Sequence, residues 1–305
     1  MNLFLLAAGF GSRLQPYTTY YPKPVIPFLN VPMGFYQFQY LIHVQQKITS
    51  FVVNTHHLPL QIETLYSKQP YIKNKAKFSF EVKNILGNGG AIKKAQPLLT
   101  ANEPILLMNA DEVYFTEQKD FLNDLLSAHE KSKSLATLVV MKHPEAGKKF
   151  GALWAHGNSV RHIGKTCSDL NLEPWHYIGV CILSWEVISH IKPDQEQNIL
   201  YDVLFPFLDR LQLFEIESTW FETGNKEDLL SATEVMLQKL EKDNQLQSFI
   251  NQYDPSRLIQ SSLVSEKHNI QPGNLVGYNC ISKSAAVSAD NVFENCIAFE
   301  KQIIK

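Results

Sequence analysis

Apolar residues in the first half of the chain form short continuous runs, and amphipathic segments of helical length separate them. Runs of this kind are typical of strands buried on both faces of a parallel sheet. The runs are Leu3–Ala8, Phe51–Asn54, Phe78–Val82, Ile105–Ala110 and Leu135–Met141. The intervening segments are Met33–Gln46, Leu58–Ser67, Ala91–Leu99 and Glu117–Lys131. The alternation predicts an α/β fold with a doubly wound, mostly parallel, Rossmann-like sheet, whose ligand binds beyond the carboxyl ends of the strands.

The pattern changes between Gly151 and Leu183, where short strands with few helical signals predict an insertion with local antiparallel structure. Helical periodicity returns at Asn198–Asp209 and Glu227–Lys242, on either side of a strand near Leu213–Glu217.

The C-terminal segment after about Pro255 has a different texture. Apolar residues recur six positions apart, and small or polar residues fill the gaps. The recurring residues are Ile270 and Val276, then Ile281, Val287 and Phe293, then Ile297 and Ile303. This rhythm predicts a short left-handed parallel β-helix fragment, although a poorly ordered tail would have a similar composition. We therefore expect one domain over residues 1–250 and a hexapeptide-repeat tail over residues 255–305.

The composition is that of an ordinary globular protein, with 45% hydrophobic residues, 19% charged residues and a net charge of −2. Such a balance argues against a general nucleic-acid or membrane surface. The placement of charge is more informative than its sum. No acidic residue precedes Glu63, whereas Arg13, Lys23 and Lys47 do. A segment with only positive charges suits a polyanionic ligand.

The four cysteines form no CxxC pair and no zinc spacing, and Cys181 lies in an apolar run where we expect it to be buried. The apolar N-terminal stretch is too short for a membrane span and has no preceding positive charge, unlike a signal peptide. We therefore expect a cytoplasmic protein that does not contact membranes.

Candidate chemistry concentrates between Leu5 and Phe28. Gly9 and Gly11 follow the first strand, where glycines let backbone N–H groups approach phosphate oxygens. Arg13 comes next, and Lys23 is flanked by two prolines. Two cations around a glycine-rich turn suit a triphosphate, although the glycines alone would also fit an ordinary strand–helix turn. A dinucleotide fingerprint is excluded because Leu14 replaces its third glycine, and no Walker A motif is present.

The run from Leu6 to Leu14, followed by Pro22-Lys23-Pro24, resembles the signature of the sugar-1-phosphate nucleotidyltransferases, especially their mannose-1-phosphate guanylyltransferase-like branch. The resemblance extends to about Lys242. It implies that Arg13 binds and polarises the triphosphate and that Lys23 holds phosphate groups. The implied nucleotide contacts of this first turn are Leu6, Ala7, Ala8, Gly9 and Gly11.

A second glycine-rich turn, Asn84–Ile92, resembles the segment that lies along base and ribose in the family. The residues concerned are Asn84, Gly87, Asn88 and Gly89. Asn88 stands where the family usually has Thr. The spacing alone also fits a helix-start turn in which Asn is the N-cap.

Two carboxylates match the positions of the metal ligands of the family. Asp111 directly follows an apolar strand, and Glu222 lies in Trp220-Phe-Glu-Thr-Gly224, where the family usually has Asp. The implied cofactor is Mg²⁺, for which glutamate is still a suitable oxygen ligand. A capping or surface role for Glu222 is the alternative.

The sugar-binding half matches less well. Phe150–Trp154 and His176–Ser184 resemble strands that line the sugar pocket of the family, while its Glu-Lys-Pro element is mostly lost. The candidate sugar-phosphate contacts are Gly151, Lys165, Glu173 and Gly179. Lys165 and Glu173 fit simple surface positions equally well, and His176 is interpreted as structural.

The resemblance implies that a sugar 1-phosphate and a nucleoside triphosphate react to give a nucleotide sugar and pyrophosphate. GTP and mannose 1-phosphate are favoured by the family branch alone. We expect small-molecule substrates, no nucleic-acid partner and a possible homo-oligomer formed through the tail. The alternative function is a non-catalytic nucleotide-sugar-binding subunit with the same fold.

Overall fold

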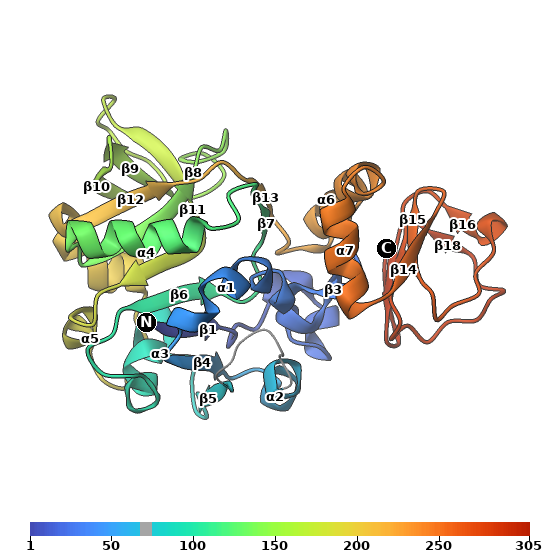
Figure 1. The fold of residues 1–305 in the computed structure, drawn as a ribbon, viewed down its shortest axis with the longest axis horizontal. Coiled ribbons are helices and arrows are strands. Elements are labelled where there is room, and N and C mark those ends of the chain that lie inside the picture. Colours follow the sequence, from blue (N-terminus) through green and yellow to red (C-terminus); the bar gives the residue numbers. More distant parts are fainter. Residues whose placement is uncertain (68–74) are drawn as a thin grey trace. The chain divides into compact units, whose positions relative to one another are not determined.

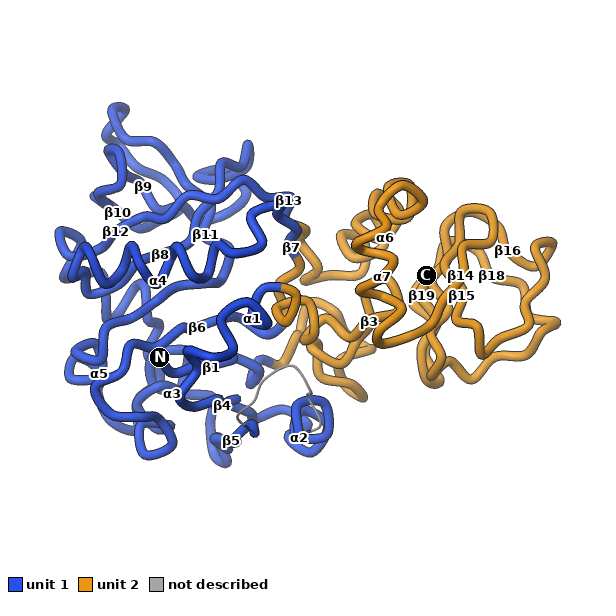
Figure 2. Tube along the Cα trace, viewed as in Figure 1, with its two compact units in different colours: residues 1–9, 40–110, 114–220 blue, residues 10–39, 111–113, 221–305 orange. Residues whose placement is uncertain are grey.

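A computed structural model describes residues 1–67 and 75–305 of the chain. The described residues divide into two compact units (Figure 2). Unit 1 comprises residues 1–9, 40–110 and 114–220, and unit 2 comprises residues 10–39, 111–113 and 221–305. The expected division of the chain into residues 1–250 and 255–305 stays a prediction about its domains.

Unit 1 is built on a nine-stranded sheet with the order β5-β4-β1-β6-β11-β8-β12-β10-β9 (Figure 1). The first four strands in this order are parallel, whereas β11 runs antiparallel to both of its neighbours. The strands are β1 Asn2–Leu6, β4 Ser50–Thr55, β5 Lys77–Phe80, β6 Ile105–Asn109, β8 Ala136–Met141, β9 Ala152–His156, β10 Ser159–Gly164, β11 Glu173–Leu183 and β12 Leu211–Glu215. The mixed α/β sheet confirms the predicted fold class. Its antiparallel part falls mainly in the region predicted as an insertion.

The predicted crossover segments contain helices. These are α1 Phe38–Val44, α2 Pro59–Ser67, α3 Gly87–Ala95 and α4 Phe121–Ser132, and the short α5 Val187–His190 follows later. On α4 the residues Phe121, Leu122, Leu125 and Leu126 are buried, which is the i, i+3, i+4 stripe of a helix packed on a core. The segment predicted as helical at Asn198–Asp209 is a π-helical turn, Ile199–Leu204, followed by a 3₁₀ helix, Phe205–Arg210.

Unit 2 contains the loop after β1, two helices and the C-terminal strands. The helices are α6 Lys226–Leu240 and α7 Asn244–Tyr253. Sequence analysis missed α7, although Leu246, Phe249 and Ile250 form its buried stripe and Asp243 caps it by accepting from Leu246 N. The short strands β7 Val113–Phe115 and β13 Thr219–Phe221, most of whose residues belong to unit 1, pair with each other.

The C-terminal strands of unit 2 pair mostly in parallel, and only the first and the last of them pair antiparallel with their neighbours. They are β14 Ser256–Ile259, β15 Ser262–Ser265, β16 Leu275–Val276, β17 Cys280–Ile281, β18 Phe293–Glu294, β19 Ile297–Phe299 and β20 Gln302–Ile304. Leu263, Cys280 and Ile297 occupy successive positions of one ladder, 17 residues apart. Val264, Ile281, Phe293 and Ala298 contribute to the core between the strands. This pairing fits the predicted β-helix fragment.

A tight hairpin joins the N-terminal loop of unit 2 to these strands. It consists of β2 Pro27–Phe28 and β3 Val31–Pro32, and its turn residues Leu29 and Asn30 have φ values of 45° and 63°. The Asn30 side chain is buried, and its Nδ2 lies 3.1 Å from Ser256 Oγ, 3.1 Å from Ile281 O and 3.4 Å from Leu263 O. The hairpin is therefore anchored on three strands of the tail.

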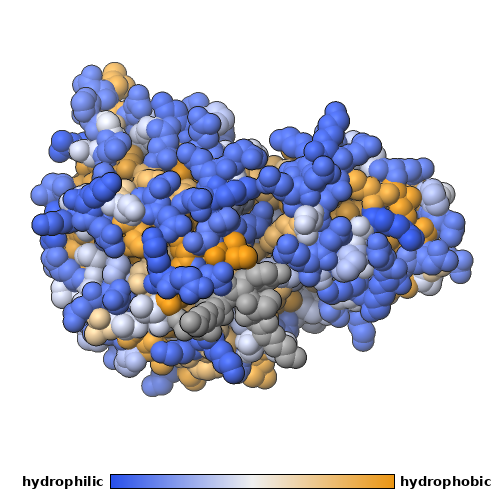
Figure 3. All heavy atoms as spheres, in the orientation of Figure 1, coloured by the Kyte–Doolittle hydropathy of each residue, from blue (hydrophilic) through white to orange (hydrophobic). Residues whose placement is uncertain are grey.

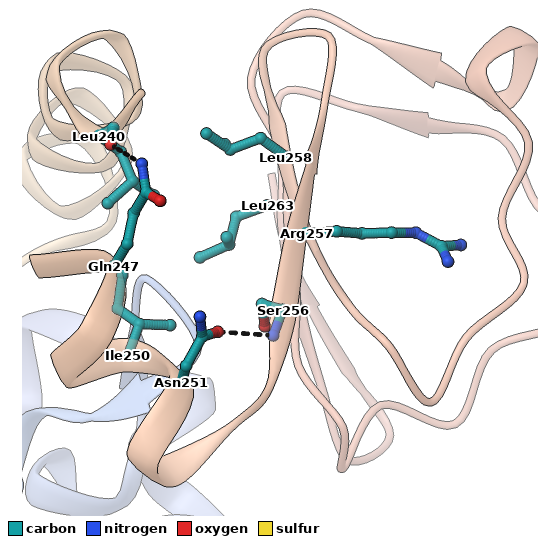
Figure 4. A pocket seen from close by; sticks show the side chains of 8 residues that line it. All are labelled: Leu240, Gln247, Ile250, Asn251, Ser256, Arg257, Leu258 and Leu263. Carbon is teal, nitrogen blue, oxygen red and sulfur yellow. Dashed lines mark hydrogen bonds between the residues drawn. The ribbon is translucent and has the colours of Figure 1, made fainter. Parts of the chain in front are cut away.

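A small pocket lies where α6 and α7 face β14 and β15 (Figure 4). Its volume is about 180 Å³, and apolar side chains such as Leu240, Ile250 and Leu258 line it together with Gln247 and Asn251. Arg257 points away from it. Gln247 Nε2 donates to Leu240 O at 2.6 Å, and Asn251 Oδ1 accepts from Ser256 N at 3.0 Å.

None of the helices within residues 1–67 and 75–305 has both the length and the apolar character needed to cross a membrane. On the face drawn in Figure 3, polar surface predominates and apolar surface lies in separate small areas.

Two histidines are buried in unit 1. His129 on α4 is 5% exposed, with Nδ1 at 2.9 Å from Thr137 Oγ1, and His176 on β11 is 6% exposed. Burial lowers the pKa of His129 to about 4, and burial together with the neighbouring His143 lowers the pKa of His176 to about 4.

The anchoring of the hairpin can be tested at Asn30. Asn30→Gly keeps a residue suited to positive φ but removes the side-chain hydrogen bonds, so it should lower the free energy of unfolding by about 1–3 kcal/mol. Asn30→Ala should cost about 1 kcal/mol more, because it adds left-handed backbone strain. Denaturant titration measures both changes. Asn102→Gly is the control, because Asn102 is exposed at φ 64°. Equal stability of Asn30→Gly and the native chain would contradict the anchor.

Because His129 and His176 are buried, we expect the folded protein to lose stability at acidic pH. Below the ordinary pKa of 6.5 the unfolded chain binds protons that the folded chain excludes until about pH 4. Stability should therefore fall as pH falls from 6.5 to 4, by up to about 1.4 kcal/mol per pH unit for each histidine. The double variant His129→Asn/His176→Phe should lose less stability between pH 7 and pH 5 in thermal melts. His156→Gln, at an exposed position, should match the native chain. An unchanged acid sensitivity of the double variant would refute this origin.

Candidate active site

The first glycine-rich turn begins where β1 ends at Leu6. Gly11 has φ 59°, and a Cβ there would lie 2.8 Å from Thr18 Cγ2, so the backbone requires glycine. Thr18 Oγ1 also donates to Gly11 O at 3.0 Å. At Gly9, by contrast, a Cβ would meet no described atom within 4 Å. Contacts within the described chain therefore explain Gly11 but not Gly9, whose open backbone leaves room for a ligand to approach closely.

Lys23 is a largely buried cation of unit 2. It opens a 3₁₀ turn after Pro22, its side chain is only 11% exposed, and its Nζ lies 2.8 Å from Asp111 Oδ2. Burial alone would lower the pKa of Lys23, but the carboxylates of Asp111, Glu112 and Glu222 outweigh it and raise that pKa. Lys23 therefore stays protonated and concentrates negative charge around itself. Sequence analysis missed Glu112, although its position directly after Asp111 was a signal.

Arg13 and Glu222 form a second pair. Arg13 Nη2 lies 3.6 Å from Glu222 Oε1, and the Arg13 side chain is 67% exposed while that of Glu222 is 18% exposed. Gly224 N donates to the same carboxylate oxygen at 2.7 Å, and any side chain on Gly224 would collide with both partners. Glycine is therefore required at position 224 to let the pair form.

Glu222 does not cap the helix that follows it. The N-cap of α6 is Asn225, whose Oδ1 accepts from Asp228 N at 2.9 Å. The capping alternative for Glu222 is therefore wrong, and its carboxylate is directed to Arg13 and Gly224 N instead.

The carboxylates of Asp111 and Glu222 are hard oxygen donors of the kind that Mg²⁺ prefers. Within residues 1–67 and 75–305 no group of three or more His, Cys, Asp or Glu side chains is arranged to hold a metal ion. The two carboxylates fit a divalent cation only if other oxygens complete its shell, as the phosphates of a bound ligand would.

The second glycine-rich turn, in unit 1, packs tightly on residues 195–199. A Cβ on Gly87, which has φ 65°, would lie 2.5 Å from Gln197 O, and Gly89 N donates to that oxygen at 2.8 Å. Asn88 Oδ1 accepts from Ile199 N at 2.6 Å, and α3 has no side-chain cap. Asn88 therefore holds the neighbouring segment rather than capping its own helix. Asn84, the first residue of this turn, is exposed.

The candidate sugar-phosphate residues lie around β9. Gly151 precedes β9, and Lys165 is exposed directly after β10, whose Gly164 pairs with Ala152, so the register brings these two candidates near each other. Glu173 begins β11 opposite Ala155, at the other end of β9. Its carboxylate lies 3.6 Å from Lys142 Nζ.

Gly179 has φ 75° and sits at the irregularity of β11 between Tyr177 and Cys181. Cys181 is fully buried, as predicted. Earlier in the same strand, His176 packs among His143, Phe150 and Trp220, and its ring centroid lies 4.4 Å from that of Trp220. This aromatic cluster agrees with a structural role for His176.

Most of the chain, residues 3–239, matches the family model described as Nucleotidyl transferase. The chain is similar to mannose-1-phosphate guanyltransferase of Yarrowia lipolytica, with 29% identity over 258 residues, 80% of this chain and 66% of that protein. A Schizosaccharomyces pombe protein of the same name is 27% identical over 295 residues, 92% of this chain and 74% of that protein. The chain thus spans about two thirds to three quarters of the length of these two relatives.

Solved structures share the fold. UDP-glucose pyrophosphorylase from Acinetobacter baumannii superposes with a TM-score of 0.66 at 15% identity, covering 82% of this chain and 97% of that one. HddC from Yersinia pseudotuberculosis, complexed with GMP-PN, gives a TM-score of 0.60 at 22% identity, covering 77% and 99%. Because the family model covers most of the chain and includes both cation–carboxylate pairs, this chain belongs to the nucleotidyl transferase family.

Proposed function

We propose that this chain joins a sugar 1-phosphate to a nucleoside triphosphate, forming a nucleotide sugar and pyrophosphate. The observation that carries the proposal is the pairing of Lys23 with Asp111 beside the pair of Arg13 and Glu222. Three separate segments of unit 2 supply these four side chains. The arrangement places cations for phosphate groups next to carboxylates suited to a metal.

The proposed reaction is an in-line displacement. An oxygen of the sugar phosphate attacks the α-phosphorus, the α–β phosphoanhydride bond breaks, and its electron pair leaves with pyrophosphate. A phosphate dianion is already a nucleophile, so the chain needs no general base. Its contribution is to position the two substrates and to balance the charge that develops on the phosphates.

Each cation has a distinct part in this scheme. Lys23 is buried, held by Asp111 and kept protonated, so its charge is fixed in place before any substrate binds. Arg13 is mostly exposed, which suits a guanidinium that contacts the triphosphate with its forked N–H groups. Asp111 and Glu222 would hold Mg²⁺, which when bound would supply charge neutralisation at phosphate oxygens.

The substrates are proposed from the relatives. Several similar proteins are named mannose-1-phosphate guanyltransferase, which favours GTP and mannose 1-phosphate for this chain. The nucleotide would lie along the backbone of Leu6–Gly11 and along the turn at Asn84–Gly89, and the sugar phosphate near Gly151, Lys165, Glu173 and Gly179.

Two observations favour a second candidate, a non-catalytic subunit that binds nucleotide sugars. The side-chain oxygen of Asn88 already accepts a hydrogen bond from Ile199 N. Glu222 stands where the family usually has aspartate, and it pairs with Arg13. A pyrophosphate-release assay with Mg²⁺, a panel of nucleoside triphosphates and a panel of sugar 1-phosphates separates the two. Release above the no-enzyme control for at least one pair is expected. Tight nucleotide-sugar binding without release for any pair would favour the second candidate.

Asp111→Asn tests the metal assignment. The amide keeps the shape but removes the charge that would hold Mg²⁺ and that pairs with Lys23, so turnover should fall by about 10²-fold or more. Steady-state pyrophosphate release measures the loss, with Asp290→Asn at an exposed position as the control. Full activity of the native chain in excess chelator would contradict the assignment.

Glu222 makes a separate prediction about magnesium. Glu222→Ala should raise the Mg²⁺ concentration needed for half-maximal rate, whereas Glu222→Asp should do so much less, because it retains a carboxylate. Magnesium titrations of the rate measure this, and thermal melts show whether the variants fold. Glu227→Ala, on the first turn of α6, serves as the control. An unchanged magnesium requirement in Glu222→Ala would leave Asp111 as the remaining candidate ligand.

A further inference from the structure

Three neighbouring parallel strands of unit 1, β5, β4 and β1, end at the same edge of the sheet. Ligands of α/β proteins bind beyond this edge. Polar side chains are buried there, among them Thr55, the last residue of β4. Asn54, next to the end of β4, is 3% exposed, and Glu81, directly after β5, is 2% exposed.

These side chains form a continuous hydrogen-bonded bridge across the strand ends. Ala7 N donates to Asn54 Oδ1 at 2.8 Å, and Asn54 Nδ2 donates to Glu81 Oε1 at 2.6 Å. Leu86 N then donates to Glu81 Oε2 at 2.7 Å. Ala7 enters the first glycine-rich turn, and Leu86 directly precedes Gly87 of the second. The bridge therefore joins the two turns through side chains alone.

The chemistry of each group suits this place. An ionised carboxylate only accepts hydrogen bonds, so Glu81 can receive one from each side. An amide both accepts and donates, so Asn54 can receive from Ala7 N and pass a bond on to Glu81. Two amides at these positions would leave one donor facing another. The backbone of Glu81 is held as well, since its N–H donates to Thr55 O at 2.8 Å.

The buried carboxylate of Glu81 is a costly feature of this sheet edge. Among the described residues no Lys or Arg side chain pairs with Glu81, and a buried charge without such a partner is costly unless hydrogen bonds satisfy it. An apolar residue would fill the same space at lower cost. What Glu81 adds is directional contact, which fixes the distance between the segments at Ala7 and at Leu86.

We propose that Asn54 and Glu81 are positioning residues that hold the two glycine-rich turns in the spacing required to bind one nucleoside triphosphate. The phosphates would lie at the turn after Ala7, and the ribose and base at the turn after Leu86. This inference rests on the proposed function, because it assumes that both turns contact the same nucleotide.

The bridge can be tested by moving its one carboxylate from position 81 to position 54. Glu81→Gln replaces one acceptor oxygen with an NH₂ group, which must then face either Asn54 Nδ2 or Leu86 N, and both are donors. Asn54→Asp keeps the acceptor for Ala7 N but sets one carboxylate against another. In the double variant the two changes are complementary. The new carboxylate at position 54 accepts from Ala7 N and from the new amide at position 81, which accepts from Leu86 N. All three hydrogen bonds of the bridge are restored, and only the bond between positions 54 and 81 has its donor and acceptor exchanged.

The measurements are equilibrium titrations of GTP, ATP, UTP, CTP and dTTP in the presence of Mg²⁺, together with KM and kcat for pyrophosphate release. Each single variant should raise the Kd and KM of the preferred triphosphate by about tenfold, the change that 1.4 kcal/mol produces, with a smaller effect on kcat. The double variant should recover most of the affinity. Glu130→Gln, an exposed position on α4, is the control for loss of a carboxylate. Thermal melts confirm that each variant is folded at the assay temperature.

The outcomes separate this inference from the proposed function. Pyrophosphate release by the native chain with unchanged triphosphate affinity in both folded single variants would overturn the inference alone. Affinity lost in the single variants and not recovered in the double variant would also overturn it. Affinity lost and recovered in a chain that releases no pyrophosphate would overturn the proposed transfer activity and support the positioning role. A native chain that binds no triphosphate would overturn both.

If a single variant does not fold, Asn54→Ser replaces it. Serine keeps a hydroxyl acceptor for Ala7 N but breaks the link to Glu81, so this variant should also raise the Kd.

Discussion

The contact between Lys23 and Asp111 is the constraint on which unit 2 depends. The Lys23 side chain is only 11% exposed, so its charge must be balanced, and Asp111 Oδ2 balances it at 2.8 Å while the carboxylates of Glu112 and Glu222 also favour the protonated amine. This brings the segment at residues 111–113 to the loop at residues 10–39. The loop in turn has little freedom, because prolines flank Lys23 and its hairpin is anchored through Asn30 on three strands of the tail. The aromatic contacts of Phe35 with Tyr253 and of Tyr36 with Phe249 extend this support to α7.

The C-terminal strands have a second role in unit 2 besides forming a stack of their own. Sequence periodicity suggests an appendage suited to assembly, whereas the contacts of Asn30 show that it also packs against the loop that carries Arg13 and Lys23. Unit 2 accordingly joins residues from both ends of the chain. A change in the tail can therefore reach the loop through the hairpin, without any direct contact with a ligand.

Sequence analysis predicted the parallel strands well because their apolar runs are continuous, and it predicted Arg13, Lys23, Asp111 and Glu222 as a set from their motifs. It missed α7, whose stripe of Leu246, Phe249 and Ile250 is interrupted by polar residues. It also could not distinguish a nucleotide contact from packing at the second turn. The glycines there are required by the backbone at Gln197, a segment more than 100 residues away, and no local pattern reveals such a neighbour. Glu81 was missed for a similar reason, since its side-chain partner Asn54 lies 27 residues away on another strand.

The two cation–carboxylate pairs also suit the ligand proposed for them. A nucleoside triphosphate with a divalent metal is itself a paired ligand, in which one part is strongly negative and the other positive. A site with unpaired cations would bind phosphates alone, and a site with unpaired carboxylates would bind metal alone. In this chain Lys23 and Arg13 each lie within 4 Å of a carboxylate, so both kinds of charge are placed in advance. Little net charge has to be buried or reorganised when a paired ligand enters, which is the condition under which electrostatic positioning contributes most to a phosphoryl-transfer step.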